Sequence, residues 1–243
     1  MREVIAFFFF FFNLIIPSTA GDSITLAVPL KDGQTLVSSN ETFELGFFSL
    51  GNSTKRYVGI WYHKIPTQTF VWVANRDKPI VKDRGGVLRI NSDGNLVIID
   101  GGGNVVWSSK IGTNSTDSIA QIRDDGNFVL TDNTGMLAWQ SFDHPTDTIL
   151  PGMKFGWDFR TGLNRSMISW KSPNDPSSGD YLYYLDTHGL PQFMMRRRSD
   201  SVLTYRSGPW NGLGLSGVPQ MKIYNMFHYE FVQDQTEVLL NRL

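Results

Sequence analysis

The chain has 243 residues, enough for one or two domains with a sizeable core. Its formal net charge is −1, so it lacks the basic field that nucleic acids or anionic membranes attract, and we expect no nucleic-acid partner. The 7 Trp and 23 Gly, together with many short Val, Ile and Phe runs, indicate an all-β protein.

The N-terminus is typical of a secretory signal. Residues 4–16 are apolar apart from Asn13, and small residues precede a cleavage point after Ala20. The run is shorter than the roughly 20 residues that span a bilayer, so we favour a cleaved signal peptide at residues 1–20 over a membrane anchor. The mature chain should then be secreted or extracellular.

Four N-x-S/T triplets agree with passage through the secretory pathway. If they are glycosylated, each asparagine should lie on an exposed turn. The asparagines are Asn40, Asn52, Asn114 and Asn164.

Cysteine is absent, although oxidising compartments permit disulfides. Either hydrophobic packing suffices, or a cysteine-bearing part of the protein is missing. We favour the second explanation because the sequence stops directly after the strand-like segments 229–232 and 237–240.

Strand-like segments follow the signal at residues 24–28, 35–37, 43–48, 57–62 and 69–73. Next, Asn75-Arg76-Asp77 precedes Pro79. This triplet is either a charged functional site or an Arg–Asp pair that stabilises a turn, and we favour the pair.

Two segments then repeat without a gap: residues 93–109 (DGNLVIIDGGGNVVWSS) and 125–141 (DGNFVLTDNTGMLAWQS). Each predicts a β-hairpin that ends in Trp, with Trp107 and Trp139 at equivalent buried positions. Two such units are too few to close a core, so we expect a third, diverged unit at residues 43–61.

Residues 142–153 predict a linker with two prolines. A catalytic or metal-binding interpretation is suggested by Asp143, His144, Asp147 and Thr148. However, no second His stands at ligand spacing and no serine-hydrolase context is present, so we favour a turn or strap and expect no metal or cofactor.

A second β-rich pattern begins at residue 169. Within it, the basic run Arg196-Arg197-Arg198 either contacts an acidic partner or protects an exposed loop or edge strand, and we favour protection.

Alternate residues of the first repeat suggest a sugar site. Asn91, Asp93, Asn95 and Val97 would share one face of an extended segment. A carboxylate accepts from sugar hydroxyls, an amide donates and accepts, and a valine can cover the C–H face. The alternative is that Asp-Gly-Asn simply forms a turn. The second repeat offers Asp125, Asn127 and Val129.

This spacing resembles the mannose motif of monocot bulb lectins, Q-x-D-x-N-x-V-x-Y. The wider chain resembles the extracellular part of plant S-locus glycoproteins and G-type lectin S-receptor-like serine/threonine kinases. The matching stretches are FELGFFS (43–49), YVGIWY (57–62), VWVANRD (71–77), DGNLV (93–97), WQSFDHPTDT (139–148), SWKS (169–172) and RSGPWNG (206–212).

The resemblance implies a bulb-type lectin domain with a β-prism fold at residues 21–143. It further implies a linker and the start of a second, incomplete lectin-like region at 144–204, and a truncated S-locus glycoprotein domain at 205–243. The membrane span and kinase of the full receptors are absent from this sequence. If the chain is part of such a receptor, it lies on the outer side of the plasma membrane.

The sugar motif carries over only in part, because Asn91 and Ile99 replace its Gln and Tyr, and Arg123 and Thr131 stand there in the second copy. Each unpaired hydroxyl forfeits about 1–3 kcal/mol, so we expect weak or dead mannose sites.

Three functions remain in consideration. The leading hypothesis is a non-catalytic recognition module for pollen recognition or defence signalling, which binds a mannose-type glycan weakly or an extracellular protein or peptide and associates with itself or with receptor kinases. The alternative is a soluble mannose-binding lectin acting alone. An enzyme is disfavoured, because no phosphate-binding loop, kinase catalytic loop or zinc spacing appears.

Overall fold

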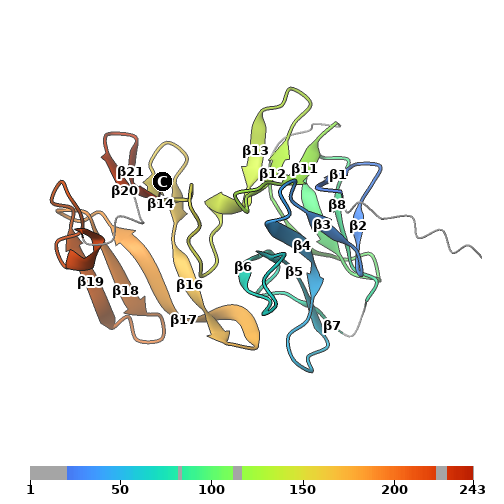
Figure 1. Cartoon of the computed structure of the whole chain (residues 1–243), viewed down its shortest axis with the longest axis horizontal. Helices are drawn as coiled ribbons and strands as arrows, with labels where there is room; N and C mark the ends of the chain where they lie inside the picture. Colours follow the sequence, from blue (N-terminus) through green and yellow to red (C-terminus); the bar gives the residue numbers. More distant parts are fainter. Residues whose placement is uncertain (1–20, 82–83, 112–116, 223–228, 243) are drawn as a thin grey trace, which may run out of the picture.

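The computed structural model describes residues 21–81, 84–111, 117–222 and 229–242. Within these residues the chain is all-β, and its strands form two regions that lie side by side (Figure 1). The expected signal peptide at 1–20 lies outside the described residues. The two described helices are single 3₁₀ turns, and neither is long and apolar enough to cross a membrane.

Three antiparallel sheets build the first region. One contains β1 (Ser23–Thr25), β11 (Ile119–Ile122), β12 (Phe128–Thr131) and β13 (Leu137–Gln140). The next contains β10 (Val105–Ser108), β9 (Leu96–Ile99), β8 (Val87–Ile90) and β2 (Leu30–Lys31). The third contains β3 (Thr35–Val37), β4 (Phe43–Phe48), β5 (Lys55–Tyr62) and β6 (Phe70–Val73), with β7 (Ile80–Val81) paired to β5.

Strand register shows that the three sheets are copies of one plan. In each sheet an aliphatic residue of the middle strand pairs with a tryptophan on the following strand: Ile60 with Trp72, Ile98 with Trp107, and Leu130 with Trp139. These aliphatic side chains are 0% exposed. The tryptophan rings meet edge to face, with centroids 5.7–6.2 Å apart. This arrangement is the predicted β-prism.

The third unit lies where the sequence predicted it, but its tryptophan was misplaced. The equivalent of Trp107 and Trp139 is Trp72 on β6, beyond the expected segment 43–61. Trp61 belongs instead to a separate buried cluster with Phe48 and Tyr57. Alternation along β5 therefore separates Trp61 from the prism core that contains Ile60.

One hydrogen bond closes every unit in the same way. A side chain beyond the third strand accepts from the main chain of the middle strand, two residues before the aliphatic residue that pairs with the tryptophan. The acceptors are Asn75 Oδ1 for Val58 N–H (2.8 Å), Ser109 Oγ for Leu96 N–H (3.1 Å) and Ser141 Oγ for Phe128 N–H (2.9 Å). The repeat thus conserves its main-chain bonding as well as its core.

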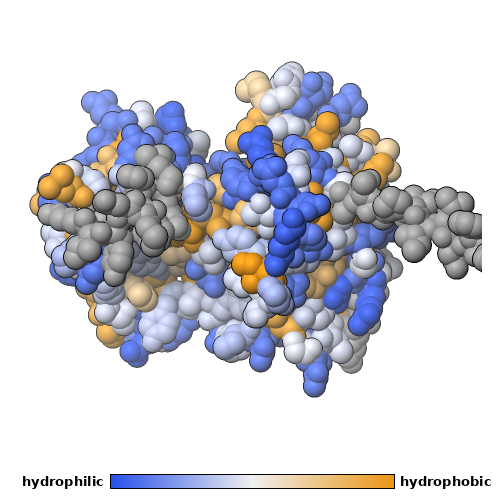
Figure 2. Space-filling model, viewed as in Figure 1, coloured by the Kyte–Doolittle hydropathy of each residue, from blue (hydrophilic) through white to orange (hydrophobic). Residues whose placement is uncertain are grey.

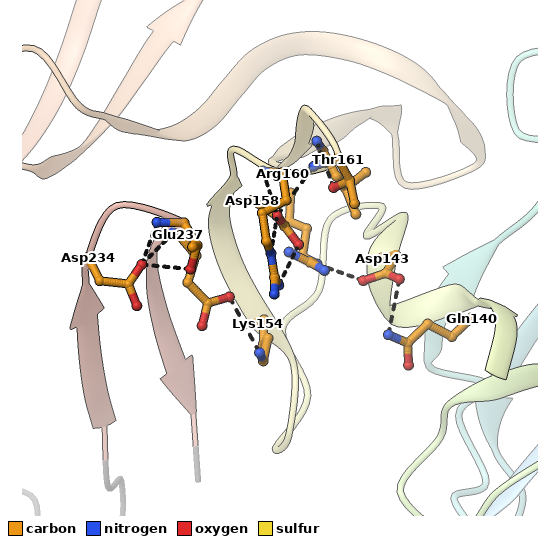
Figure 3. Close-up of polar contacts among 11 residues, drawn as sticks. Gln140, Asp143, Lys154, Asp158, Arg160, Thr161, Asp234 and Glu237 are labelled. Atoms are coloured by element: carbon orange, nitrogen blue, oxygen red, sulfur yellow. Dashed lines mark hydrogen bonds and ion pairs between the residues drawn. The ribbon is translucent and has the colours of Figure 1, made fainter. Parts of the chain in front are cut away.

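Among the described residues, the second region has two four-stranded sheets. One contains β15 (Leu163–Arg165), β14 (Lys154–Asp158), β21 (Glu237–Arg242) and β20 (Tyr229–Gln233). The other contains β16 (Met167–Ser172), β17 (Asp175–Asp186), β18 (Gln192–Arg197) and β19 (Leu203–Pro209). Figure 3 shows the Lys154–Glu237 ion pair, 3.6 Å long, that joins β14 to β21.

Separate hydrophobic cores support the two regions. The first core includes Leu150 and Met153 as well as the prism strands, and the second is built on Phe155, Leu185 and Phe193. Because β14 pairs with β21, the segments 144–204 and 205–243 contribute to one sheet. The division of the chain at residues 143 and 204 stays a prediction.

Candidate functional site

The first predicted sugar motif forms a tight turn between β8 and β9. Asn91 N–H donates to Asn95 O (2.8 Å), and Gly94 N–H donates to Asn91 O (2.9 Å). Asp93 is exposed, and its carboxylate accepts from Asn95 N–H at 3.0 Å. Side-chain and backbone hydrogen bonds from Asn95 lower the pKa of Asp93. The carboxylate is therefore ionised and accessible, as a sugar contact requires.

The rest of this motif is engaged inside the protein. Asn95 Oδ1 accepts from Ile111 N–H (2.8 Å) and from the Ser109 hydroxyl (3.3 Å). Val97 is only 3% exposed. A ligand would thus find neither the amide oxygen nor the valine surface free, while Asn91 is half-buried beside the turn.

The second motif repeats this geometry with deeper burial. Asp125 is exposed and accepts from Asn127 N–H at 2.8 Å. Asn127 is 4% exposed; its Nδ2 donates to Gln140 Oε1 (2.9 Å) and its Oδ1 accepts from the Ser141 hydroxyl (3.2 Å). Val129 is 1% exposed. In both copies the asparagine side chain links the turn to the end of the last strand of its hairpin, β10 or β13, or to the residues just beyond it. Sugar binding at these residues stays a prediction.

The third sheet carries aromatic side chains where the repeats carry the motif. By register, Tyr57 and Gly59 stand at the positions of Asn95 and Val97. Phe48, Tyr57 and Trp61 form a buried cluster with Val73, and Phe70 stacks on Phe48 with a centroid distance of 3.9 Å. Burial, aided by the nearby Asp175 charge, raises the pKa of Tyr57 to about 12.

The second region covers this aromatic cluster. Trp170 of β16 packs against it, with its ring centroid 6.0 Å from that of Phe70. Lys55 of β5 forms a 3.6 Å ion pair with Asp175 of β17. The outward face of the third sheet is thus an interface between the two regions.

Arg76 and Asp77 belong to the same interface, which corrects their predicted role. The Arg76 guanidinium donates to three carbonyl oxygens of the second region: Pro176 (2.7 Å), Ile168 (3.0 Å) and Ser169 (2.8 Å). The Asp77 carboxylate accepts from Ser178 N–H (2.6 Å) and Oγ–H (2.7 Å). Burial lowers the pKa of Arg76. The two residues do not pair with each other across a turn; each binds the second region.

The first residues of the predicted linker 142–153 belong to a strap, which comprises residues 141–146. The His144 ring stacks on Trp139 at 5.5 Å, and the His144 carbonyl accepts from Trp72 Nε1 at 2.9 Å. The Asp143 carboxylate accepts from Gln140 Nε2 at 3.0 Å (Figure 3). It also accepts from Arg165 Nε at 2.7 Å. The described part of the chain contains no cluster of three or more His, Cys, Asp or Glu that could hold a metal ion.

Two further expectations need correction. Asn40 and Asn52 lie on exposed turns, but Asn164 is half-buried within β15; Asn114 lies outside the described residues. The Arg198 end of the basic run is exposed in the turn that follows β18, which agrees with the exposed-loop alternative, but Arg196 and Arg197 do not lie on an edge strand, because β18 pairs with both β17 and β19. There Arg196 lies over the Tyr184 ring at 5.0 Å, and Arg198 donates to Gly179 O at 2.8 Å.

Comparison with known proteins finds one matching family model and several similar solved structures. A family model described as D-mannose binding lectin matches residues 69–171. A monomeric monocot mannose-binding lectin from Gastrodia elata is a structural neighbour, with 20% sequence identity over 50% of this chain and 96% of its own, at a TM-score of 0.39. The chain is an all-β protein with a bulb-type lectin domain.

Its relatives extend over almost the whole sequence. The chain is 44% identical to a receptor-like serine/threonine-protein kinase of Arabidopsis thaliana over 96% of its own length and 28% of the kinase. It is 43% identical to an S-locus-specific glycoprotein of Brassica oleracea var. alboglabra over 95% of its own length and 54% of that protein. The chain belongs to this family of S-locus glycoproteins and G-type lectin S-receptor-like kinases, and spans about half the length of the former.

Proposed function

We propose that the chain is a non-catalytic extracellular recognition module that acts in pollen recognition or defence signalling. Its relatives include S-locus-specific glycoproteins and receptor-like kinases, and the sequence carries no kinase catalytic loop. It binds an extracellular protein or peptide, and mannose-type glycans bind only weakly. It associates with itself or with receptor kinases on the outer side of the plasma membrane.

One observation favours a protein or peptide ligand over mannose. In both Asp-Gly-Asn turns the asparagine oxygen and the valine are used within the protein, so only Asp93 and Asp125 offer an exposed contact. A weak monosaccharide site near a millimolar Kd has only about −4 kcal/mol in total, which the loss of two contacts nearly removes.

Retention on immobilised mannose tests this assignment. We expect the secreted chain to pass through a mannose column with little delay. Strong retention that free mannose releases would instead establish the alternative, a soluble mannose-binding lectin acting alone. In that case the double variant D93N/D125N should abolish retention, whereas D100N/D132N, at the other turns of the same hairpins, should not.

Association is the second measurable property. Several large apolar side chains of the second region are exposed, and Figure 2 shows apolar residues in small separate groups on the face drawn. Exposed apolar surface favours association. We expect concentration-dependent self-association in size-exclusion chromatography, and a stable monomer at all concentrations would contradict it. The exposed side chains are Phe159, Tyr181, Leu190, Val202, Leu203 and Leu213.

A further inference from the structure

The prism has a groove that is separate from the two Asp-Gly-Asn turns. Its volume is about 770 Å³, within the roughly 300–1,000 Å³ typical of small-molecule sites. It lies where the three tryptophans meet, between the end of β10, the turn after β6 and the strap. None of the motif residues from Asn91 to Val97 lines it.

Asymmetry between the two repeats creates this groove. After Trp139 the chain continues into the strap, and the His144 ring covers that tryptophan by stacking on it. Trp139 is therefore 6% exposed, whereas Trp107 stays half-buried. Trp107 and the exposed Val105 thus give the groove an apolar wall.

Lysines flank this wall. Lys78 and Lys110 both line the groove and are exposed, and neither ammonium forms an ion pair with a carboxylate of the described chain. Lys110 has a φ of 53°, a left-handed conformation that non-glycine residues rarely adopt and that is frequent at functional sites. Its N–H donates to Ser108 Oγ at 3.2 Å.

The charged side chains of Arg76 and Asp77, which also line the groove, already form hydrogen bonds within the protein. Arg76 donates to three carbonyl oxygens, and the Asp77 carboxylate accepts two hydrogen bonds from Ser178. The charges left for a ligand are the two ammonium groups. A complementary ligand therefore carries carboxylates beside an apolar face.

We propose that this groove binds an acidic oligosaccharide, with carboxylates near Lys78 and Lys110 and the C–H face of a sugar ring against Trp107. An acidic peptide is the less suitable ligand. β10 is an edge strand, but its register shifts between Val105 and Trp107, and such a bulge interrupts the regular ladder that an added peptide strand requires. The proposal assumes the extracellular recognition role but is independent of the mannose motif.

Titration of the full chain with trigalacturonate, followed by tryptophan fluorescence and calorimetry, tests this site. We expect saturable binding that weakens as salt increases. The variant K78Q/K110Q should bind about tenfold more weakly, as expected for the loss of two exposed ion pairs. A matched control, K31Q/K171Q, removes two exposed lysines that do not line the groove and should bind like the wild type.

Each alternative result overturns the proposal. The first is no binding at about 10 mM trigalacturonate, and the second is that K78Q/K110Q binds trigalacturonate as tightly as the wild type does. The third is that neutral maltotriose binds the wild type as tightly as trigalacturonate does. The fourth is tighter binding of hexaglutamate than of trigalacturonate, which would assign the groove to acidic peptides. Circular dichroism should first show that all variants fold alike. The mannose-column result is independent, so failure of one assignment leaves the other standing.

Discussion

The three sheets of the prism share one core but differ on their outward faces. In the two repeats that face holds a buried valine next to an Asp-Gly-Asn turn. In the third sheet glycine replaces the valine, and an aromatic cluster packs under Trp170 of the second region. The core therefore fixes the inward residues of all three sheets, while the third outward face has become an interface within the molecule.

The largest effect should come from removing the guanidinium at this interface. Arg76 is 9% exposed and donates to three carbonyl oxygens of the second region. In Arg76→Ala these acceptors lose their donor, so we expect the free energy of unfolding to fall by about 3 kcal/mol in urea titration. Arg89→Ala, at an exposed position on β8, should change it by no more than about 0.5 kcal/mol. Equal effects would show that the interface contributes little.

A second test places the valine of the two repeats at the equivalent position of the third sheet, Gly59. A Cβ at Gly59 would lie 2.7 Å from Phe48 Cε1 and 2.8 Å from Trp72 O. Gly59→Val should therefore cost about 2 kcal/mol in the same titration, because the crowded aromatic cluster must shift.

Gly21→Val is the matched control, because a Cβ there meets no atom within 4 Å. If the third face were merely a degenerate sugar site with room to spare, both variants would unfold at the same urea concentration.

The core was predictable from sequence because it repeats. Identical spacing of Gly, Asn, Val and Trp in two segments predicted the repeated hairpins, and the family resemblance implied the prism. The strand-like segments 43–48 and 57–62 gave most of the third sheet. The missed feature, Trp72 in place of Trp61, depends on which face of β5 and β6 meets the axis. Packing against the other two sheets decides which face is inward, and the sequence of one strand alone does not determine it.

The interface was harder to predict because its partners are far apart in sequence. Arg76 reaches carbonyl groups about a hundred positions later, and main-chain acceptors have no signature in side-chain patterns. The only available signal in residues 57–62 was that Tyr57 and Trp61, two large aromatic residues, share the face opposite Val58 and Ile60. The turn residues Asp93 and Asp125 were found, but the burial of Val97 and Val129 depends on contacts that spacing does not specify.

The two motif asparagines should differ in their effect on stability. Asn127 is 4% exposed and joins Gln140, Ser141 and the Asp125 turn, whereas Asn95 is half-buried. Asn127→Ala should cost about 2 kcal/mol and Asn95→Ala about 1 kcal/mol, because unpaired groups cost more where water is excluded. Thermal unfolding of the two variants measures this. A larger loss for Asn95→Ala would mean that the first turn supports the prism more than its burial suggests.

The smallest expected effect is a change in how the stability of the protein depends on pH. Hydrogen bonds from Asn104 and from Thr134 lower the pKa of Asp100 and Asp132, which hold equivalent turns of the two repeats. Since their folded-state pKa is lowered, their stabilisation is complete above the ordinary carboxyl pKa of about 4 and is lost as pH falls through the lowered value. The corresponding turn of the third sheet, residues 63–69 between β5 and β6, contains no carboxylate.

The variant D100N/D132N keeps both turns but removes these titrations. Its Tm should lie slightly below that of the wild type at pH 7, and the two should converge as pH falls toward 3, because all other carboxylates titrate in both proteins. Serine variants of Thr67 and Gln68, two exposed residues of this third turn, should instead keep a constant Tm difference from the wild type at every pH. A gap between D100N/D132N and the wild type that does not change with pH would show that these aspartates act through turn geometry alone, and that the repeats and the third sheet respond to acid alike.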